Sequence, residues 1–182
     1  SYFKSIITNH SKANKMTDCN GTCEVCDCKL LDETILNTNN WPLNTILMVT
    51  IFKNFNEVVE HKTIPMILEE IKTGKYKHAI VYLRKSLSEN KLEAYEKAKK
   101  SLPAFTPSGK FIGGRKMDFL VDYSNCIILD IDKLNTEELV KVNHLARQCE
   151  FTYACFISPS GNGLKILVKV SITKNEHKET FL

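Results

Sequence analysis

The feature that most constrains the fold is a hydrophobic run with two alternate aspartates, IILDID at residues 127–132, followed by a glycine-containing stretch, SPSGNGLK, at residues 158–165. The branched apolar residues of the first stretch predict a buried strand. Because successive side chains of a strand point to opposite faces, Asp130 and Asp132 are expected on one face. The sequence therefore predicts a strand that presents a pair of carboxylates.

The carboxylate pair is expected to attract a cation. Two carboxylates held this close repel each other unless a cation or a proton neutralises them, and hard oxygen ligands suit Mg²⁺ or Mn²⁺, which commonly also hold substrate phosphates. The stretch at residues 158–165 offers backbone N–H groups that a phosphate can approach closely, and it ends in Lys165. Together these features indicate a metal-dependent nucleotide site. The alternative is that the aspartates only serve as turn and cap residues at a strand end.

The two stretches resemble the first and second motifs of the archaeo-eukaryotic primase superfamily. With KSLPAFTPSGKF at residues 100–111 and the region of Arg115, they look like the primase-polymerase-like module at the N-terminus of VirE-type proteins of mobile elements and phages. The resemblance covers roughly residues 45–182 and leaves residues 1–44 as an N-terminal extension. It implies an α/β (α+β) fold of the primase-polymerase-like, RRM-like kind, in which helices flank a mixed or antiparallel sheet.

What the resemblance implies for function is a DNA primase-polymerase that performs two-metal nucleotidyl transfer. Asp130 and Asp132 would be the catalytic metal ligands, and the turn would hold the triphosphate of a nucleoside triphosphate. The residues expected to bind the nucleotide are Ser158, Ser160, Gly161, Gly163 and Lys165. Lys165 is also a catalytic candidate, but family members usually carry histidine at that position. Neutralisation of phosphate is therefore retained, whereas proton donation by imidazole is not.

Two departures from the family pattern leave a second function open. Residues 166–182 supply no convincing third carboxylate of the kind that primase-polymerases place on a later strand, and Lys165 replaces the usual histidine. We expect the third acid beyond Leu182, in a parent protein that continues into a helicase-like ATPase domain. The alternative is a noncatalytic module that binds nucleic acid or nucleotide and is attached to that ATPase.

Basic charge is concentrated between Ile71 and Lys116, a segment that contains twelve lysines and arginines but only three glutamates. This local excess of +9, against −5 for the rest of the chain, is typical of a surface for the phosphates of single-stranded or primed DNA. Tyr76, Tyr82 and Phe105 are candidates for base stacking. The other interpretation is a solvated helix face. The basic residues expected to contact nucleic acid are Lys99, Lys100, Lys110, Arg115 and Lys116.

The N-terminal extension contains a cysteine cluster, CxxxCxxCxC, formed by Cys19, Cys23, Cys26 and Cys28. Four thiols are enough for a tetrahedral zinc site in a chain whose disulfides are not expected to persist. The spacing is unusual, because structural zinc sites commonly join two separated cysteine pairs. The alternative is a disordered tail with reactive cysteines, since Asn, Thr, Lys and Asp dominate the neighbouring sequence.

The length of 182 residues and the hydrophobic content of 43% predict one domain with a sizeable core. No stretch is long and apolar enough for a membrane span, and no signal peptide is recognisable, so we expect a cytoplasmic protein. Residues 76–87 fit neither a helix nor a strand clearly, and residues 106–114 are expected to form a loop. Thr136 is expected to cap a helix that follows the aspartate strand. The other predicted elements are strands at 45–53, 118–123, 152–157 and 165–170 and helices at 65–72 and 90–101.

Overall fold

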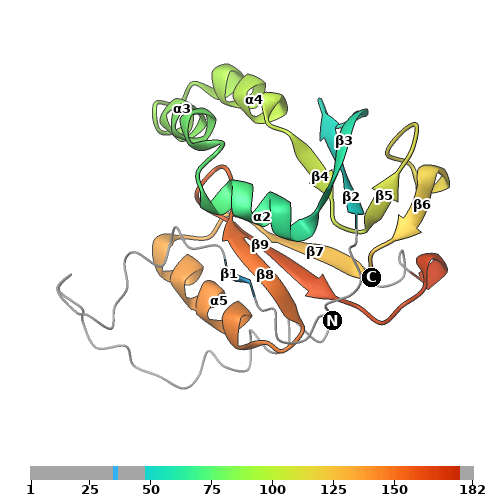
Figure 1. The fold of residues 1–182 in the computed structure, drawn as a ribbon. Helices are drawn as coiled ribbons and strands as arrows, with labels where there is room; N and C mark the ends of the chain where they lie inside the picture. Colours follow the sequence, from blue (N-terminus) through green and yellow to red (C-terminus); the bar gives the residue numbers. More distant parts are fainter. Residues whose placement is uncertain (1–34, 37–47, 177–182) are drawn as a thin grey trace.

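The structure is a computed structural model that describes residues 35–36 and 48–176 of the chain (Figure 1). Within these residues, antiparallel sheets are flanked by four α-helices, which confirms the predicted α+β class. No helix in the described part is long and apolar enough to cross a membrane. The predicted cysteine cluster lies outside the described residues, so its two interpretations stay predictions.

The elements follow one another in an irregular order of strands and helices. In chain order they are β1 (Ile35–Leu36), β2 (Met48–Lys53), β3 (Glu57–Thr63), α2 (Ile64–Lys72), α3 (Lys77–Ser88), α4 (Leu92–Ser101), β4 (Ala104–Thr106), β5 (Gly109–Phe111), β6 (Leu120–Tyr123), β7 (Cys126–Ile131), α5 (Thr136–Gln148), β8 (Thr152–Ile157) and β9 (Leu164–Lys169). Two short 3₁₀ segments, Met117–Phe119 and Lys174–Glu176, complete the described chain.

The main sheet has the strand order β1-β8-β9-β7, with every neighbouring pair antiparallel. Alternate side chains of β9 enter two different cores: Leu164 and Ile166 pack with α5, whereas Leu167 packs with α2 and β2. Figure 1 shows α2 and α5 on opposite sides of this sheet. Because both faces are covered, the residues of β7, β8 and β9 are mainly apolar, with Asp130, Lys165 and Lys169 as the charged exceptions.

Two smaller sheets lie beside the main one. The order β3-β2-β4 forms a three-stranded sheet, and β5 pairs with β6. The predicted loop at residues 106–114 therefore contains the end of β4 and all of β5, so this part of the prediction was wrong. Gly109 begins β5 with a φ of +153°, and a Cβ there would lie 1.9 Å from the carbonyl oxygen of Asp122. Only glycine allows the two strands to approach this closely.

The helices agree with the sequence patterns except at two points. The ambiguous stretch 76–87 forms α3, whose Leu83 is fully buried. The cap of α5 is Asn135, not Thr136, so that prediction was wrong by one residue. Asn135 accepts a hydrogen bond from the N–H of Glu138 at 2.9 Å, and the Glu138 carboxylate accepts from the N–H of Asn135 at 2.9 Å. This reciprocal capping box starts the helix directly after the aspartate stretch.

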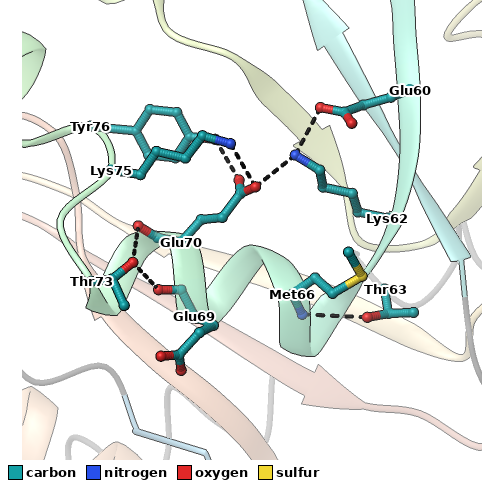
Figure 2. A network of polar contacts seen from close by, with 9 residues as sticks. All are labelled: Glu60, Lys62, Thr63, Met66, Glu69, Glu70, Thr73, Lys75 and Tyr76. Atoms are coloured by element: carbon teal, nitrogen blue, oxygen red, sulfur yellow. Dashed lines mark hydrogen bonds and ion pairs between the residues drawn. The ribbon is translucent and has the colours of Figure 1, made fainter.

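A polar network joins β3, α2 and the start of α3 (Figure 2). Glu70 accepts hydrogen bonds from Lys62 at 2.7 Å, from Lys75 at 2.6 Å and from the Tyr76 hydroxyl at 2.7 Å. Burial raises the pKa of Glu70, but these three donors outweigh it and hold the pKa at about 2. Burial and the bond to Glu70 raise the pKa of Tyr76 to about 12. The network therefore fixes the approach of the chain into α3.

We expect Glu70→Gln to destabilise the fold at neutral pH by on the order of 2 kcal/mol, because it removes a partly buried charge that satisfies three donors. The pKa of Glu70 is lower in the folded chain than its ordinary value of 4.5, so its contribution is present above pH 4.5 and is lost as pH falls toward 2. Urea unfolding at several pH values measures the difference between variant and wild type. That difference should shrink over this acid range.

The matched control is Glu69→Gln, which changes the same charge one residue earlier on α2, where the side chain is exposed. It should leave stability within roughly 0.5 kcal/mol of wild type. An equal loss of stability in both variants would contradict this role of Glu70. So would a loss of stability in Glu70→Gln that is unchanged at pH 2.

Candidate functional site

The register of the main sheet brings the two sequence stretches together at one end of β7. Asp130 pairs directly with Lys165 on β9, and Lys165 Nζ donates to Asp130 Oδ2 at 2.5 Å. The pair lies on the α2 side of the sheet, the face to which Ile128 and Leu167 also contribute. The Asp130 side chain is 46% exposed and that of Lys165 is 24% exposed. A carboxylate and a cation are therefore available to solvent at the strand end.

Asp132 lies against the glycine turn. Strand β7 ends at Ile131, so Asp132 follows the strand rather than belonging to it. A Cβ on Gly163 would be 3.0 Å from Asp132 Oδ1 and 2.7 Å from the carbonyl oxygen of Ile131. The N–H of Leu134 donates to the carbonyl of Asn162 at 2.8 Å. The absence of a side chain at Gly163 thus lets the second aspartate and the turn lie in contact.

The turn is held in shape by its own polar groups. The hydroxyls of Ser158 and Ser160 are 2.9 Å apart, and Ser160 Oγ donates to Asn162 Oδ1 at 2.6 Å. Gly161 donates its N–H to the carbonyl of Ser158 at 2.9 Å and has a φ of +87°, which favours glycine. The N–H groups of Ser160 and Asn162 donate to no residue that the structure describes. They remain as candidate donors for an anion.

An arginine that the sequence did not single out also reaches the turn. Arg84, on α3, donates through Nε to the carbonyl of Pro159 at 3.2 Å, and its Nη2 is 3.5 Å from the carbonyl of Ser158. Its Nε is 3.1 Å from where a Cβ on Gly161 would lie. The basic composition of residues 71–116 was visible in the sequence, but nothing local shows which cation contacts the turn. Arg84 therefore adds a second positive charge to the site, at the turn itself.

The oxygen ligands at this site suit a divalent cation that shares its coordination with phosphate. Mg²⁺ is usually bound by one or two carboxylates plus substrate phosphates and water, and Asp130 and Asp132 offer that number. One oxygen of Asp130 is engaged by Lys165, which leaves the other for a cation. In the described ranges, no group of three or more His, Cys, Asp or Glu side chains gathers as a metal cage. Asp130 and Asp132 are therefore the residues that could hold a cation at this site together with oxygens of a ligand.

The predicted nucleic-acid contacts lie in two places. Lys99 and Lys100 are exposed in the last turn of α4, and Arg115 and Lys116 are exposed in the segment before β6. None of these four forms an ion pair with a described residue. Lys110 is half-buried in β5. The structure thus leaves the four exposed cations available and gives Lys110 a more enclosed position.

The three aromatic candidates for base stacking differ in their surroundings. The hydroxyl of Tyr76 is bonded to Glu70 in the network of Figure 2. Tyr82 is 57% exposed on α3. Phe105 is half-buried and packs against the core formed by the main sheet and α2. Tyr82 therefore offers the freest ring, whereas Phe105 presents only part of its surface.

Part of the chain matches a known family model. Residues 97–182 match the family model described as BT4734-like, N-terminal domain, a family of the primase-polymerase-like type. The matched part contains both aspartates, the complete turn and Lys165, and it begins after α3, so that Arg84 lies outside it. No curated protein and no solved structure gives a significant match to this chain.

Proposed function

We propose that this chain is the nucleotidyltransferase module of a DNA primase-polymerase and binds a nucleoside triphosphate where β7 meets the glycine turn. The observation that carries the proposal is the contact between the two stretches: Asp130 is paired with Lys165, and Asp132 lies against Gly163. Carboxylates, cations and open backbone donors at one sheet edge have the chemistry to hold a triphosphate together with its counterion. The family match over residues 97–182 supports the same class.

Each group has a distinct part in this proposal. Bound Mg²⁺ or Mn²⁺ would neutralise phosphate charge and activate the attacking 3′-hydroxyl. Asp130 and Asp132 hold that cation, while Lys165, which is paired with Asp130, and Arg84, which contacts the turn, neutralise the triphosphate. The N–H groups of the turn bind phosphate oxygens without a side chain in the way. Before the nucleotide binds, the ion pair with Lys165 holds the Asp130 carboxylate in position. When the nucleotide binds, its phosphates and their cation would attract both side chains.

DNA, as single strand or primed template, is the proposed second substrate. Helices α3 and α4 carry six of the twelve basic residues between Ile71 and Lys116, and Arg84 of α3 touches the turn. DNA bound along these helices would therefore lie next to the nucleotide. The finer resemblance to VirE-type proteins belongs to the same proposal. On this proposal, the module would work in DNA replication by a mobile element or phage, ahead of a helicase-like ATPase.

Template-directed incorporation of nucleotides by the complete natural protein tests the proposal. We expect incorporation that requires Mg²⁺ or Mn²⁺ and depends on a DNA template. The second candidate, a noncatalytic binding module, is favoured by one observation, the lysine at position 165 in place of the family's usual histidine. Absence of transfer with any metal or template, combined with normal DNA binding when Asp130 and Asp132 are both replaced, would decide for the binding module.

Arg84→Ala should weaken binding of a nucleoside triphosphate by at least roughly tenfold, because a charge-assisted contact to phosphate contributes about 1.5–3 kcal/mol. Arg84→Lys should recover part of this, since it keeps the charge but not the planar fork. Isothermal titration with dATP and Mn²⁺ measures both. Lys85→Ala, one residue further along α3 and facing away toward Glu89, is the control and should bind normally. Equal loss in both variants would remove Arg84 from the site.

Charge reversal at Lys99 and Lys100 should weaken binding of single-stranded DNA of any sequence, because neutralised phosphates release counterions. The affinity of the wild-type protein for DNA should fall steeply with added salt. For the double variant, the slope of log Kd against log salt concentration should be shallower by about 0.7 for each phosphate that the variant no longer neutralises. Fluorescence anisotropy across a salt series gives both quantities. Charge reversal at Lys53 and Lys141 changes the net charge by the same amount outside the basic segment. It should have little effect on DNA binding. Salt-independent binding would show that the basic segment only aids solubility.

A further inference from the structure

A small cavity lies beside the aspartate strand, away from the glycine turn. Its volume is about 160 Å³, and it is open to solvent on one side. The end of β4 and the turn that follows form one wall, and β7 forms the other. The residues that line it are Phe105, Thr106, Pro107, Ser108, Arg115, Ile127 and Ile128. This volume is well below the roughly 300 Å³ at which pockets for drug-sized ligands begin, so the cavity suits one compact group.

The lining combines flat and apolar surfaces with one unsatisfied polar group. Phe105 presents part of its ring, and the Arg115 guanidinium, which lies 6.0 Å from the ring centre of Phe52, is exposed. Thr106 is only 8% exposed, and its Oγ1 has no hydrogen-bond partner among the described residues. A buried hydroxyl without a partner costs free energy, which a ligand with its own polar edge would recover.

The cavity is aligned with the proposed phosphate site. Ile128, in its wall, and Asp130 are two residues apart on β7, so their side chains lie on the same face with a separation of roughly 7 Å. A ligand that fills the cavity and continues along this face therefore arrives at Asp130 and Lys165. A nucleotide has this layout, with one sugar between its base and its first phosphate.

We propose that the cavity receives the base of the nucleoside triphosphate whose phosphates lie at Asp130, Asp132 and the glycine turn. This inference rests on the proposed function and adds to it a base site formed by the protein itself. Unpaired bases stack on aromatic rings and on arginine guanidinium planes, which Phe105 and Arg115 provide. Thr106 Oγ1 can donate to or accept from the polar edge of the base.

The test compares dATP with inorganic triphosphate, each with Mn²⁺, by isothermal titration. Wild type should bind dATP at least about fivefold more tightly, because base stacking contributes about 1–3 kcal/mol. Ser108→Phe, which fills the cavity from its turn, should remove most of that difference and leave the Kd for inorganic triphosphate unchanged. Thr106→Val, which loses only the hydroxyl, should weaken dATP about fivefold. Ser101→Phe, at the exposed end of α4, is the control for an added ring.

The outcomes separate the inference from the proposed function. One outcome has inorganic triphosphate binding as tightly as dATP. Another has Ser108→Phe weakening dATP no more than it weakens inorganic triphosphate. Either result would show that the base site is wrong, while the phosphate site would stand. If neither compound binds, the proposed function fails and the base site with it. If Ser108→Phe weakens single-stranded DNA and not dATP, the cavity receives a template base and the inference is overturned. Thermal unfolding of each variant confirms that it is folded.

Discussion

Asp130→Asn should reduce metal-dependent nucleotide incorporation by at least about 100-fold, the size of loss seen when one group that stabilises transition-state charge is removed. The Asp130 side chain is 46% exposed at the end of β7, so the change should have little effect on folding. Asp132→Asn should have a similar effect, because Asp132 lies against Gly163 of the glycine turn. Single-nucleotide extension of a primed template by the complete protein measures the rate.

The effect should be specific to these two carboxylates. Asp122→Asn, an exposed aspartate on β6, is the matched control and should keep nearly full activity. Lys165→Ala should mainly weaken nucleotide binding, whereas Lys165→His should be tolerated, since the resemblance requires a basic side chain beside the phosphates. Normal incorporation by both Asp130→Asn and Asp132→Asn would exclude this site as the catalytic one.

Gly163→Ala should separate the second aspartate from the turn. The added Cβ would lie 2.7 Å from the Ile131 carbonyl oxygen and 3.0 Å from Asp132 Oδ1, closer than such contacts allow. The backbone carbonyl cannot swing away as a side chain can, so the turn must shift. We expect a loss of about 1–3 kcal/mol in stability, as for overpacking, and at least tenfold weaker binding of inorganic triphosphate with Mn²⁺.

The control for this prediction is Gly113→Ala, at a position outside the candidate site. Gly113 has a φ of +88°, so alanine is strained there as well, but its Cβ would meet only the Phe119 ring at 3.4 Å. Gly113→Ala should therefore lower the unfolding temperature and leave triphosphate binding unchanged. Parallel thermal unfolding and titration of the two variants measure this. Normal binding by Gly163→Ala would show that contact between Asp132 and the turn is not needed.

Local sequence determined the elements that carry the candidate site. Strand β7, the turn and β9 follow from apolar runs and glycines within a few residues of one another, and the observed β9 differs from the strand predicted at 165–170 by one residue at each end. The same local signals predicted α2, α4 and α5, although the cap of α5 is Asn135 and not Thr136. A side-chain cap forms where a side-chain oxygen accepts from the N–H of the third residue of the helix. Asn and Thr both have such an oxygen, so the sequence alone does not show which of the two adjacent residues is the cap.

Tertiary structure alone decided the short strands and the surroundings of the turn. Strands β4 and β5 have three residues each, too few to show a period, and they exist because β2 and β6 supply their hydrogen-bond partners. Arg84 is separated by 75 residues from Pro159, whose carbonyl it contacts. The cavity between β4 and β7 likewise joins distant segments. The sequence by itself therefore determined which residues carry the carboxylates and the turn, whereas packing between distant elements decided which cation and which cavity lie beside them.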